Sequence, residues 1–275
     1  MRYLFILLFI PILGNSQFFE SKSQVVYGIN LGTHIGNDST ALLYNGYYNP
    51  TYNINTILFS SNANTSNSNL TNYLDETLGY NNWQVQNVPA QMKYRPGLEV
   101  GLHVGIQKEK IKYYIDYNFA ELKAVGEFNI VQIFNSTNNV VKENVLVSVV
   151  GEERRSFINL GLISELVSEN EYHLGLPLFF QINQTKFKTN YIIVENQKYV
   201  IPNPNLGTTT NQNNINQVGS GFGLGTGLVG TIALNESINF SVAYHLQYSN
   251  IKITNDFNNT GLQNSLIARI IWNKE

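Results

Sequence analysis

The chain has 275 residues, of which 13% are charged and 12% are aromatic, and its formal net charge is -2. This composition excludes a nucleic-acid-binding surface, which needs a basic stripe, and the absence of cysteine excludes a disulfide scaffold and a lipid-anchored lipoprotein. Beyond the N-terminus there is no run of about 18 apolar residues, so the sequence offers no membrane-spanning helix.

Residues 1–16 have the features of a signal peptide. Arg2 supplies the positive charge, Leu4 to Leu13 form a short apolar core, and Gly14-Asn15-Ser16 provides small residues for cleavage. We therefore expect residues 17–275 to be exported and to fold as a single domain.

From residue 24 onward, apolar side chains recur at every second position in eight separate runs. Because successive side chains of a strand point to opposite faces, each run predicts a strand with one apolar face. The expected strands cover about residues 24–35, 93–107, 110–121, 156–167, 172–182, 217–232, 238–248 and 266–272. The third strand is expected to continue through residues 128–133 as a ribbon above the membrane, returning through residues 145–150.

The connections between these strands alternate between short and long. Tight turns are expected at residues 107–110, 168–171 and 234–237, and the long segments are residues 36–91, 122–155 and 183–216. This asymmetry is typical of outer-membrane barrels, whereas a Greek-key sandwich mixes connection lengths at both ends. No segment shows helical periodicity, so the sequence predicts an all-β fold. It predicts an eight-stranded antiparallel transmembrane β-barrel with short periplasmic turns and long extracellular loops.

Aromatic residues are expected to face outward at both edges of the apolar band. Rings at these two levels can sit in lipid while their polar atoms reach water. The predicted interface residues are Tyr27, Tyr113, Tyr172 and Trp272 near the turn end, and Tyr94, Tyr244 and Tyr248 near the loop end.

The inward faces of the strands carry polar and charged residues. These charges are expected to pair with each other, because an unpaired buried charge is costly. The predicted lumen network consists of Arg95, Glu99, Lys112, Asp116, Glu165 and Arg269. Such a network predicts a plugged lumen, and a conducting pore is the alternative. All four histidines also face inward, but at different depths, so they predict no metal site.

Two further motifs resemble sites of chemistry. Residues 225–230 match the glycine fingerprint of dinucleotide-binding proteins, but they lie within a strand and open no helix. Ser241 and His245 share one strand face, yet the spacing of a strand places them roughly 13 Å apart. The sequence therefore predicts no cofactor and no enzymatic activity.

The signal ending in Ser16-Gln17, the eight alternating strands and the late Trp272 resemble a known family. They resemble the outer-membrane β-barrel proteins of Bacteroidota, including the PorT-like group, whose architecture is similar to the small OmpA and OmpX barrels. The resemblance implies a location in the cell outer membrane. PorT-like proteins have been tied to protein secretion and gliding.

We expect a non-enzymatic barrel whose long loops serve binding, adhesion or assembly of a cell-envelope or secretion complex. The expected partners are outer-membrane lipid and, through the loops, envelope or secretion-system proteins, with no nucleic acid. The loops are rich in Tyr and Asn, which suits contacts with a partner or a glycan, although a solvated, poorly ordered surface has the same composition. The alternatives are a barrel that transports small solutes or hydrophobic molecules and a membrane-embedded lipid-modifying enzyme.

Overall fold

The computed structural model describes residues 23–48, 53–59, 68–78, 83–133, 144–169, 171–201, 218–253 and 257–274. The predicted signal peptide, residues 1–16, lies outside the described residues. Among the residues described, no helix is long and apolar enough to cross a membrane.

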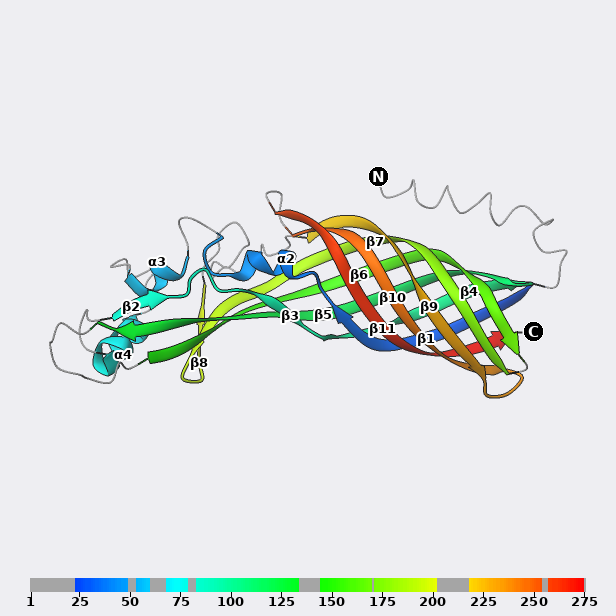
Figure 1. Ribbon diagram of the computed structural model, residues 1–275, viewed down its shortest axis with the longest axis horizontal. Coiled ribbons are helices and arrows are strands. Elements are labelled where there is room, and N and C mark those ends of the chain that lie inside the picture. Colours follow the sequence, from blue (N-terminus) through cyan, green and yellow to red (C-terminus); the bar gives the residue numbers. More distant parts are fainter. Residues whose placement is uncertain are drawn as a thin grey trace.

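Eight long strands form a closed ring (Figure 1). They are β1 (Gln24–Ile35), β4 (Gly97–Lys108), β5 (Ile111–Gln132), β6 (Asn144–Glu169), β7 (Tyr172–Val194), β9 (Val218–Ala233), β10 (Ile238–Lys252) and β11 (Asn258–Lys274). Each strand pairs antiparallel with the next in this order, and β11 pairs with β1 to complete the ring. The predicted eight-stranded barrel is confirmed.

The outer wall of the ring is an apolar band exposed on every strand. One exposed residue from each strand in ring order is Leu31, Leu102, Ile115, Leu166, Leu178, Leu224, Val242 and Ile270. On β5 the outward apolar row runs from Ile111 to Phe119 and then gives way to Glu121 and Lys123. That height of about nine residues matches what a tilted strand needs to cross a bilayer. Soluble proteins rarely expose a continuous apolar surface of this extent, so the barrel is transmembrane.

The described tight turns lie at one end of the ring, where the C-terminus also lies (Figure 1). At this end Tyr27 of β1 lies opposite Trp272 of β11 in the strand register, and both side chains are exposed. Tyr113 and Tyr172 are exposed at the same end, and Tyr244 and Tyr248 are exposed toward the other end. Six of the seven predicted interface aromatics therefore face outward.

The predictions for Tyr94 and Arg95 are wrong, and both errors have one cause. Tyr94 is 6% exposed, whereas Arg95 is exposed, the reverse of what an unbroken strand over residues 93–107 predicts. The strand is divided into β3 (Lys93–Arg95) and β4, and Arg95 and Pro96 are both exposed in succession. The pairing with β5 shifts by one residue there, from Glu99 opposite Ala120 to Arg95 opposite Lys123. A one-residue bulge reverses the faces of every residue beyond it.

Strands β5, β6 and β7 continue far beyond the apolar band, and their extensions form the sheet of a second structure (Figure 1). β2 (Trp83–Gln86) and β3 pair with the extension of β5, and β8 (Gln197–Val200) pairs with that of β7. We call this structure the head, with described residues 37–48, 53–59, 68–78, 83–95, 120–133, 144–155 and 184–201. The predicted ribbon over residues 128–133 and 145–150 is thus confirmed as part of it.

One face of the head sheet is covered by helices around a separate apolar core. The helices are α2 (Asp38–Ala41), the 3-10 turn η2 (Leu42–Tyr44), α3 (Ile54–Phe59) and α4 (Ser68–Leu78). Leu70, Leu74 and Leu78 are fully buried on one side of α4 against the sheet. The expectation of no helical periodicity over residues 36–91 is therefore wrong, since this spacing of four places all three leucines on one helix face.

Candidate functional site

The middle of the lumen is filled by a connected polar network. Arg269 on β11 donates from Nη2 to Asp116 Oδ2 at 2.8 Å and from Nε to Asn30 Oδ1 at 2.6 Å. His103 Nδ1 lies 2.6 Å from Asp116 Oδ1. All four residues are at most 1% exposed. A buried charge pair held by further hydrogen bonds is stable, whereas removal of one partner leaves an uncompensated charge.

The network continues toward the head through amide side chains. Asn30 donates to Asn118 Oδ1 at 2.8 Å, and Asn118 donates to Glu99 Oε1 at 2.6 Å. On the opposite wall Gln181 donates to Asn159 and Gln247 at 3.1 and 2.6 Å. These contacts join β1, β4 and β5 on one side of the lumen and β6, β7 and β10 on the other.

A second ion pair closes the lumen where it meets the head. Arg155 and Glu153 on β6 are both fully buried, with Arg155 Nε 2.5 Å from Glu153 Oε1. Arg155 also donates to Thr40 Oγ1 on α2 at 3.1 Å and to the Tyr94 hydroxyl at 3.2 Å. The Tyr44 hydroxyl donates to Glu153 Oε2 at 2.6 Å. Burial raises the pKa of Tyr44 well above its usual value, and the Glu153 carboxylate raises the pKa further.

This ion pair fastens α2 across the mouth of the barrel. Asn37 caps α2 by accepting from Ser39 N at 3.0 Å, and Asn259 on β11 donates to Ser39 O at 3.0 Å. Arg155 additionally donates to Gln263 of β11. The helix is thereby bonded to two strands of the ring, and it links the lumen network to the core of the head.

The structure brings together three of the six predicted lumen residues. Glu99, Asp116 and Arg269 are buried in the same network. Lys112 and Glu165 lie nearer the tight turns, where they line a cavity. Arg95 lies on the exposed side of β3 and is outside the lumen.

Sequence analysis missed Arg155 and Glu153. The sequence places them in the long segment of residues 122–155, because the expected strand begins at residue 156. The signal was present, since Glu153, Arg155 and Phe157 continue the inward alternation of β6.

The four histidines do not converge. His34 bonds Ser265 Oγ at 2.9 Å, His103 bonds Asp116, and His173 lies 3.4 Å from Glu165 Oε1. His245 Nδ1 and Ser241 Oγ are buried without a hydrogen-bond partner among the described residues, so the structure does not join this pair. Within the described part of the chain, no group of three or more His, Asp or Glu residues is arranged to hold a metal ion.

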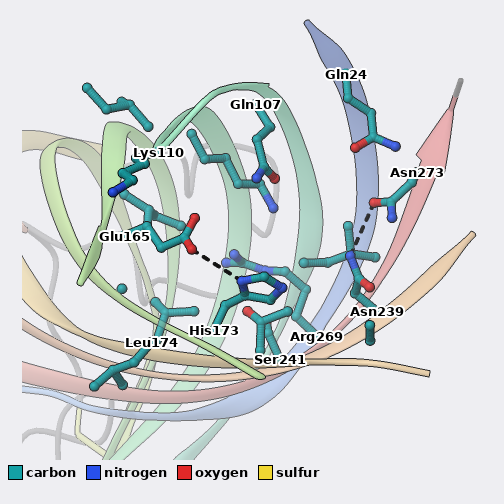
Figure 2. A pocket seen from close by; sticks show the side chains of 18 of the residues that line it. Gln24, Gln107, Lys110, Glu165, His173, Leu174, Asn239, Ser241, Arg269 and Asn273 are labelled. Carbon is teal, nitrogen blue, oxygen red and sulfur yellow. Dashed lines mark hydrogen bonds and ion pairs between the residues drawn. The ribbon is translucent and has the colours of Figure 1, made fainter. Parts of the chain in front are cut away.

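The lumen opens toward the tight turns into a cavity of about 300 Å³. Figure 2 shows His173, Ser241 and Arg269 gathered in its interior and Gln24, Gln107 and Asn273 around it. Asn239 donates to Asn273 Oδ1 at 3.3 Å. This cavity is separated from the head by the whole polar network.

The uncovered face of the head sheet carries paired charges. Glu121 on β5 accepts from Arg154 on β6 at 2.7 Å and from Lys188 on β7 at 2.8 Å. The hydrogen bond from Lys188, reinforced by Arg154, lowers the pKa of Glu121 to about 2. Lys198 lies 3.7 Å from the centre of the Tyr191 ring, and the Tyr191 hydroxyl donates to Glu152 at 2.8 Å. We call this surface the head face.

No family model matches the sequence, and no curated protein matches it. Among solved structures, Neisserial surface protein A is similar at 8% identity and a TM-score of 0.40, over 90% of this chain and 96% of that one. Ail, the attachment invasion locus protein of Yersinia pestis, is similar at 7% identity and a TM-score of 0.31, over 92% of this chain and 97% of that one. The eight-stranded barrel is established by the strand pairing of this chain itself.

Proposed function

We propose that this protein is a non-enzymatic outer-membrane barrel whose head binds a protein of the cell envelope on the outer side of the membrane. The observation that carries the proposal is the apolar core of the head. Helices α2, α3 and α4, the turn η2 and segments of seven strands bury it together, so the described parts of the long connections are folded. A solvated connection between barrel strands would have no such core.

A folded head suits binding for an energetic reason. Ordering a flexible loop upon association consumes part of the free energy gained from its contacts. Here the order is already present, because the sheet of the head continues the barrel wall without a break on β5, β6 and β7. The head therefore has a fixed position relative to the membrane.

The head face is the surface that we propose for the contact. A row across β5, β6, β7 and β8 contains Val125, Val150, Tyr191 and Val200, which are partners in register. Val200 is 48% exposed, whereas Tyr191 is 5% and Val150 is 2% exposed, so Val200 and the charged side chains form the accessible part of this face. Ionic pairs flank the row, including Lys123 Nζ and Glu152 Oε1 at 3.6 Å. Aromatic and apolar residues within a polar rim are typical of protein interfaces.

The closed mouth of the barrel supports binding over transport. Arg155, Tyr94 and Thr40 fill the junction between the lumen and the head, and all are nearly or fully buried. A solute would have to displace a bonded ion pair and α2 to pass. We expect planar-bilayer recordings of the purified barrel to show no steady conductance, and a steady open channel would favour the transport alternative.

Site-specific crosslinking on intact cells tests the proposed contact. We expect a photo-reactive residue in place of Val200 to give a discrete crosslinked protein, and Lys123→Ala, which removes an exposed charge of the same face, to reduce that product severalfold. A photo-reactive residue in place of Leu234, which is 63% exposed in a tight turn at the opposite end, is the matched control. Heat-modifiable migration shows that each variant is assembled. The same crosslinked product from both positions, or none from Val200 in the assembled protein, would contradict the proposal.

A further inference from the structure

The cavity at the turn end of the lumen is lined by polar groups that neither the barrel nor the head requires. Its wall combines cationic and hydrogen-bonding side chains from several strands, including Lys112 on β5, Ser241 on β10 and Arg269 on β11. These residues lie on the opposite side of the polar network from the head, so the following argument does not depend on the proposed head function.

Lys112 reaches into the lumen without a counter-ion. A Cβ atom on Gly105 of β4 would lie 3.1 Å from Lys112 Cε. The absence of a side chain at Gly105 therefore makes room for the lysine side chain. No carboxylate among the described residues lies within ion-pair distance of its ammonium group. A half-buried cation in a protein wall is more stable with an anion beside it.

Ser241 supplies a second unsatisfied group in the same wall. Its hydroxyl is fully buried and has no hydrogen-bond partner among the residues described. It is the direct cross-strand partner of Arg269, and both line the cavity. Buried hydroxyls nearly always have a partner, so the unpartnered Ser241 hydroxyl is available to bond a ligand in the cavity.

Arg269 is held rigidly at the inner end of the cavity. Its Nε and Nη2 bonds to Asn30 and Asp116 fix the plane of the guanidinium group. A Cβ atom on Gly28 would lie 3.3 Å from Arg269 Cγ. Gly28 therefore makes room for the arginine side chain, as Gly105 does for Lys112. Two glycines on neighbouring strands thus admit two cationic side chains to one end of the lumen.

The carboxylates that line the cavity do not pair with Lys112. Glu165 lies 3.4 Å from His173 Nδ1, and Glu236 is exposed in the turn between β9 and β10. Lys110 adds a further cation at the rim. The interior therefore presents positive charge and a hydroxyl donor, which are the groups that bind oxyanions.

We propose that this cavity binds the carboxylate or phosphate group of a small organic anion, between Lys112 and the Ser241–Arg269 pair. A volume of about 300 Å³ is at the lower end of the range for ligand pockets, roughly 300–1,000 Å³. The ligand is therefore small, and it enters from the side of the tight turns.

Nuclear magnetic resonance of the full-length barrel in zwitterionic detergent micelles tests this inference. Sodium phosphate and sodium acetate are titrated separately against sodium chloride at constant ionic strength. We expect at least one of them to produce saturable shifts of the backbone amides of Lys112, Ser241 and Arg269. Tighter binding of phosphate identifies a phosphate-bearing ligand, and tighter binding of acetate identifies a carboxylate.

Three variants locate the binding. We expect Lys112→Gln to weaken it at least tenfold, and Ser241→Ala to weaken it severalfold while leaving the barrel folded, because the lost hydroxyl has no partner. Lys186→Gln, at an exposed lysine in the head, is the matched control and leaves binding unchanged. Shifts that never saturate, which indicate an adventitious ion only, or saturable shifts that survive Lys112→Gln and Ser241→Ala, would overturn the inference.

Discussion

Two neighbouring arginines show how strongly position determines the role of a residue. Arg154 and Arg155 are adjacent on β6, so their side chains point to opposite faces. Arg154 faces solvent and pairs with Glu121, whereas Arg155 is fully buried and pairs with Glu153. The two ion pairs have similar geometry and very different surroundings.

We expect Arg155→Met to destabilise the protein much more than Arg154→Met. Removing Arg155 leaves Glu153 buried without a cation, which typically costs about 3–5 kcal/mol. Removing Arg154 breaks an exposed pair, which typically contributes about 0–1 kcal/mol. Urea unfolding in detergent, followed by tryptophan fluorescence, measures both. The double variant Arg155→Met with Glu153→Leu should regain most of the loss, and equal effects of the two single variants would show that the buried pair does not fasten the head.

The lowered pKa of Glu121 gives a second prediction at the scale of single residues. Its pKa of about 2 lies below the usual value of 4.5 because Lys188 and Arg154 donate to it. The ionised Glu121 carboxylate therefore stabilises the folded state fully above about pH 4.5, and this stabilisation is lost as the pH falls toward 2. Solvent exposure keeps its contribution to stability small.

Carboxyl carbon resonances of Glu121 report this pKa directly. We expect Lys188→Gln to raise the pKa toward 4.5, because the first of its two donors is lost. Lys198→Gln is the control, since Lys198 lies over the Tyr191 ring. A pKa unchanged by Lys188→Gln would contradict the hydrogen bond in the head face.

At the scale of elements, the glycines of β9 set the packing of the lumen wall. A Cβ on Gly225 would lie 2.2 Å from Cζ of Phe179, its partner in register on β7. Gly225 therefore makes room for an aromatic ring from the adjacent strand.

We expect Gly225→Ala to destabilise the barrel by about 1–3 kcal/mol, the usual effect of overpacking, and Phe179→Leu to relieve it in the double variant. Gly230→Ala on the same strand is the matched control, because nothing lies within 4 Å of a Cβ there. Urea unfolding compares the variants. Equal effects at the two glycines would contradict the packing of Gly225 against Phe179.

The strands of the ring could be predicted from sequence because their lipid-facing rows leave an unbroken period of two. The alternation fails where one face of the sheet no longer contacts lipid. At Arg95 and Pro96 a bulge reverses the faces. Pro96 is the local signal for it, because proline within a sheet is confined to edge strands, strand starts and bulges. Arg155 was predictable from continued alternation, but the charges at residues 152–155 resembled a loop.

The helices of the head were missed for a different reason. Leu70, Leu74 and Leu78 form a narrow apolar stripe in a segment rich in Asn, Ser and Thr. Such a helix is stabilised mainly by tertiary packing, here in the apolar core that it shares with β2, β5, β6 and β7. The burial of that stripe depends on partners that lie far away in the sequence.

At the scale of the molecule, one continuous sheet serves two environments. Its outward rows meet lipid around the ring, and beyond the band the same strands carry the head with its own core. The lumen between them is closed toward the head by Arg155 and α2 and open toward the tight turns. This arrangement places the folded head at one end of the barrel and the cavity lined by Lys112 and Arg269 at the other.

Cysteine labelling of intact cells tests the central claim most directly, because the chain contains no cysteine of its own. The three variants are Glu127→Cys on the head face, Leu74→Cys in the head core and Glu236→Cys in a tight turn. With a membrane-impermeant maleimide, we predict labelling of Glu127→Cys on intact cells, of Glu236→Cys only after the cells are broken, and of Leu74→Cys only after denaturation. Labelling of Leu74→Cys on intact cells would show that the head is not folded, and labelling of Glu236→Cys there would place the tight turns outside.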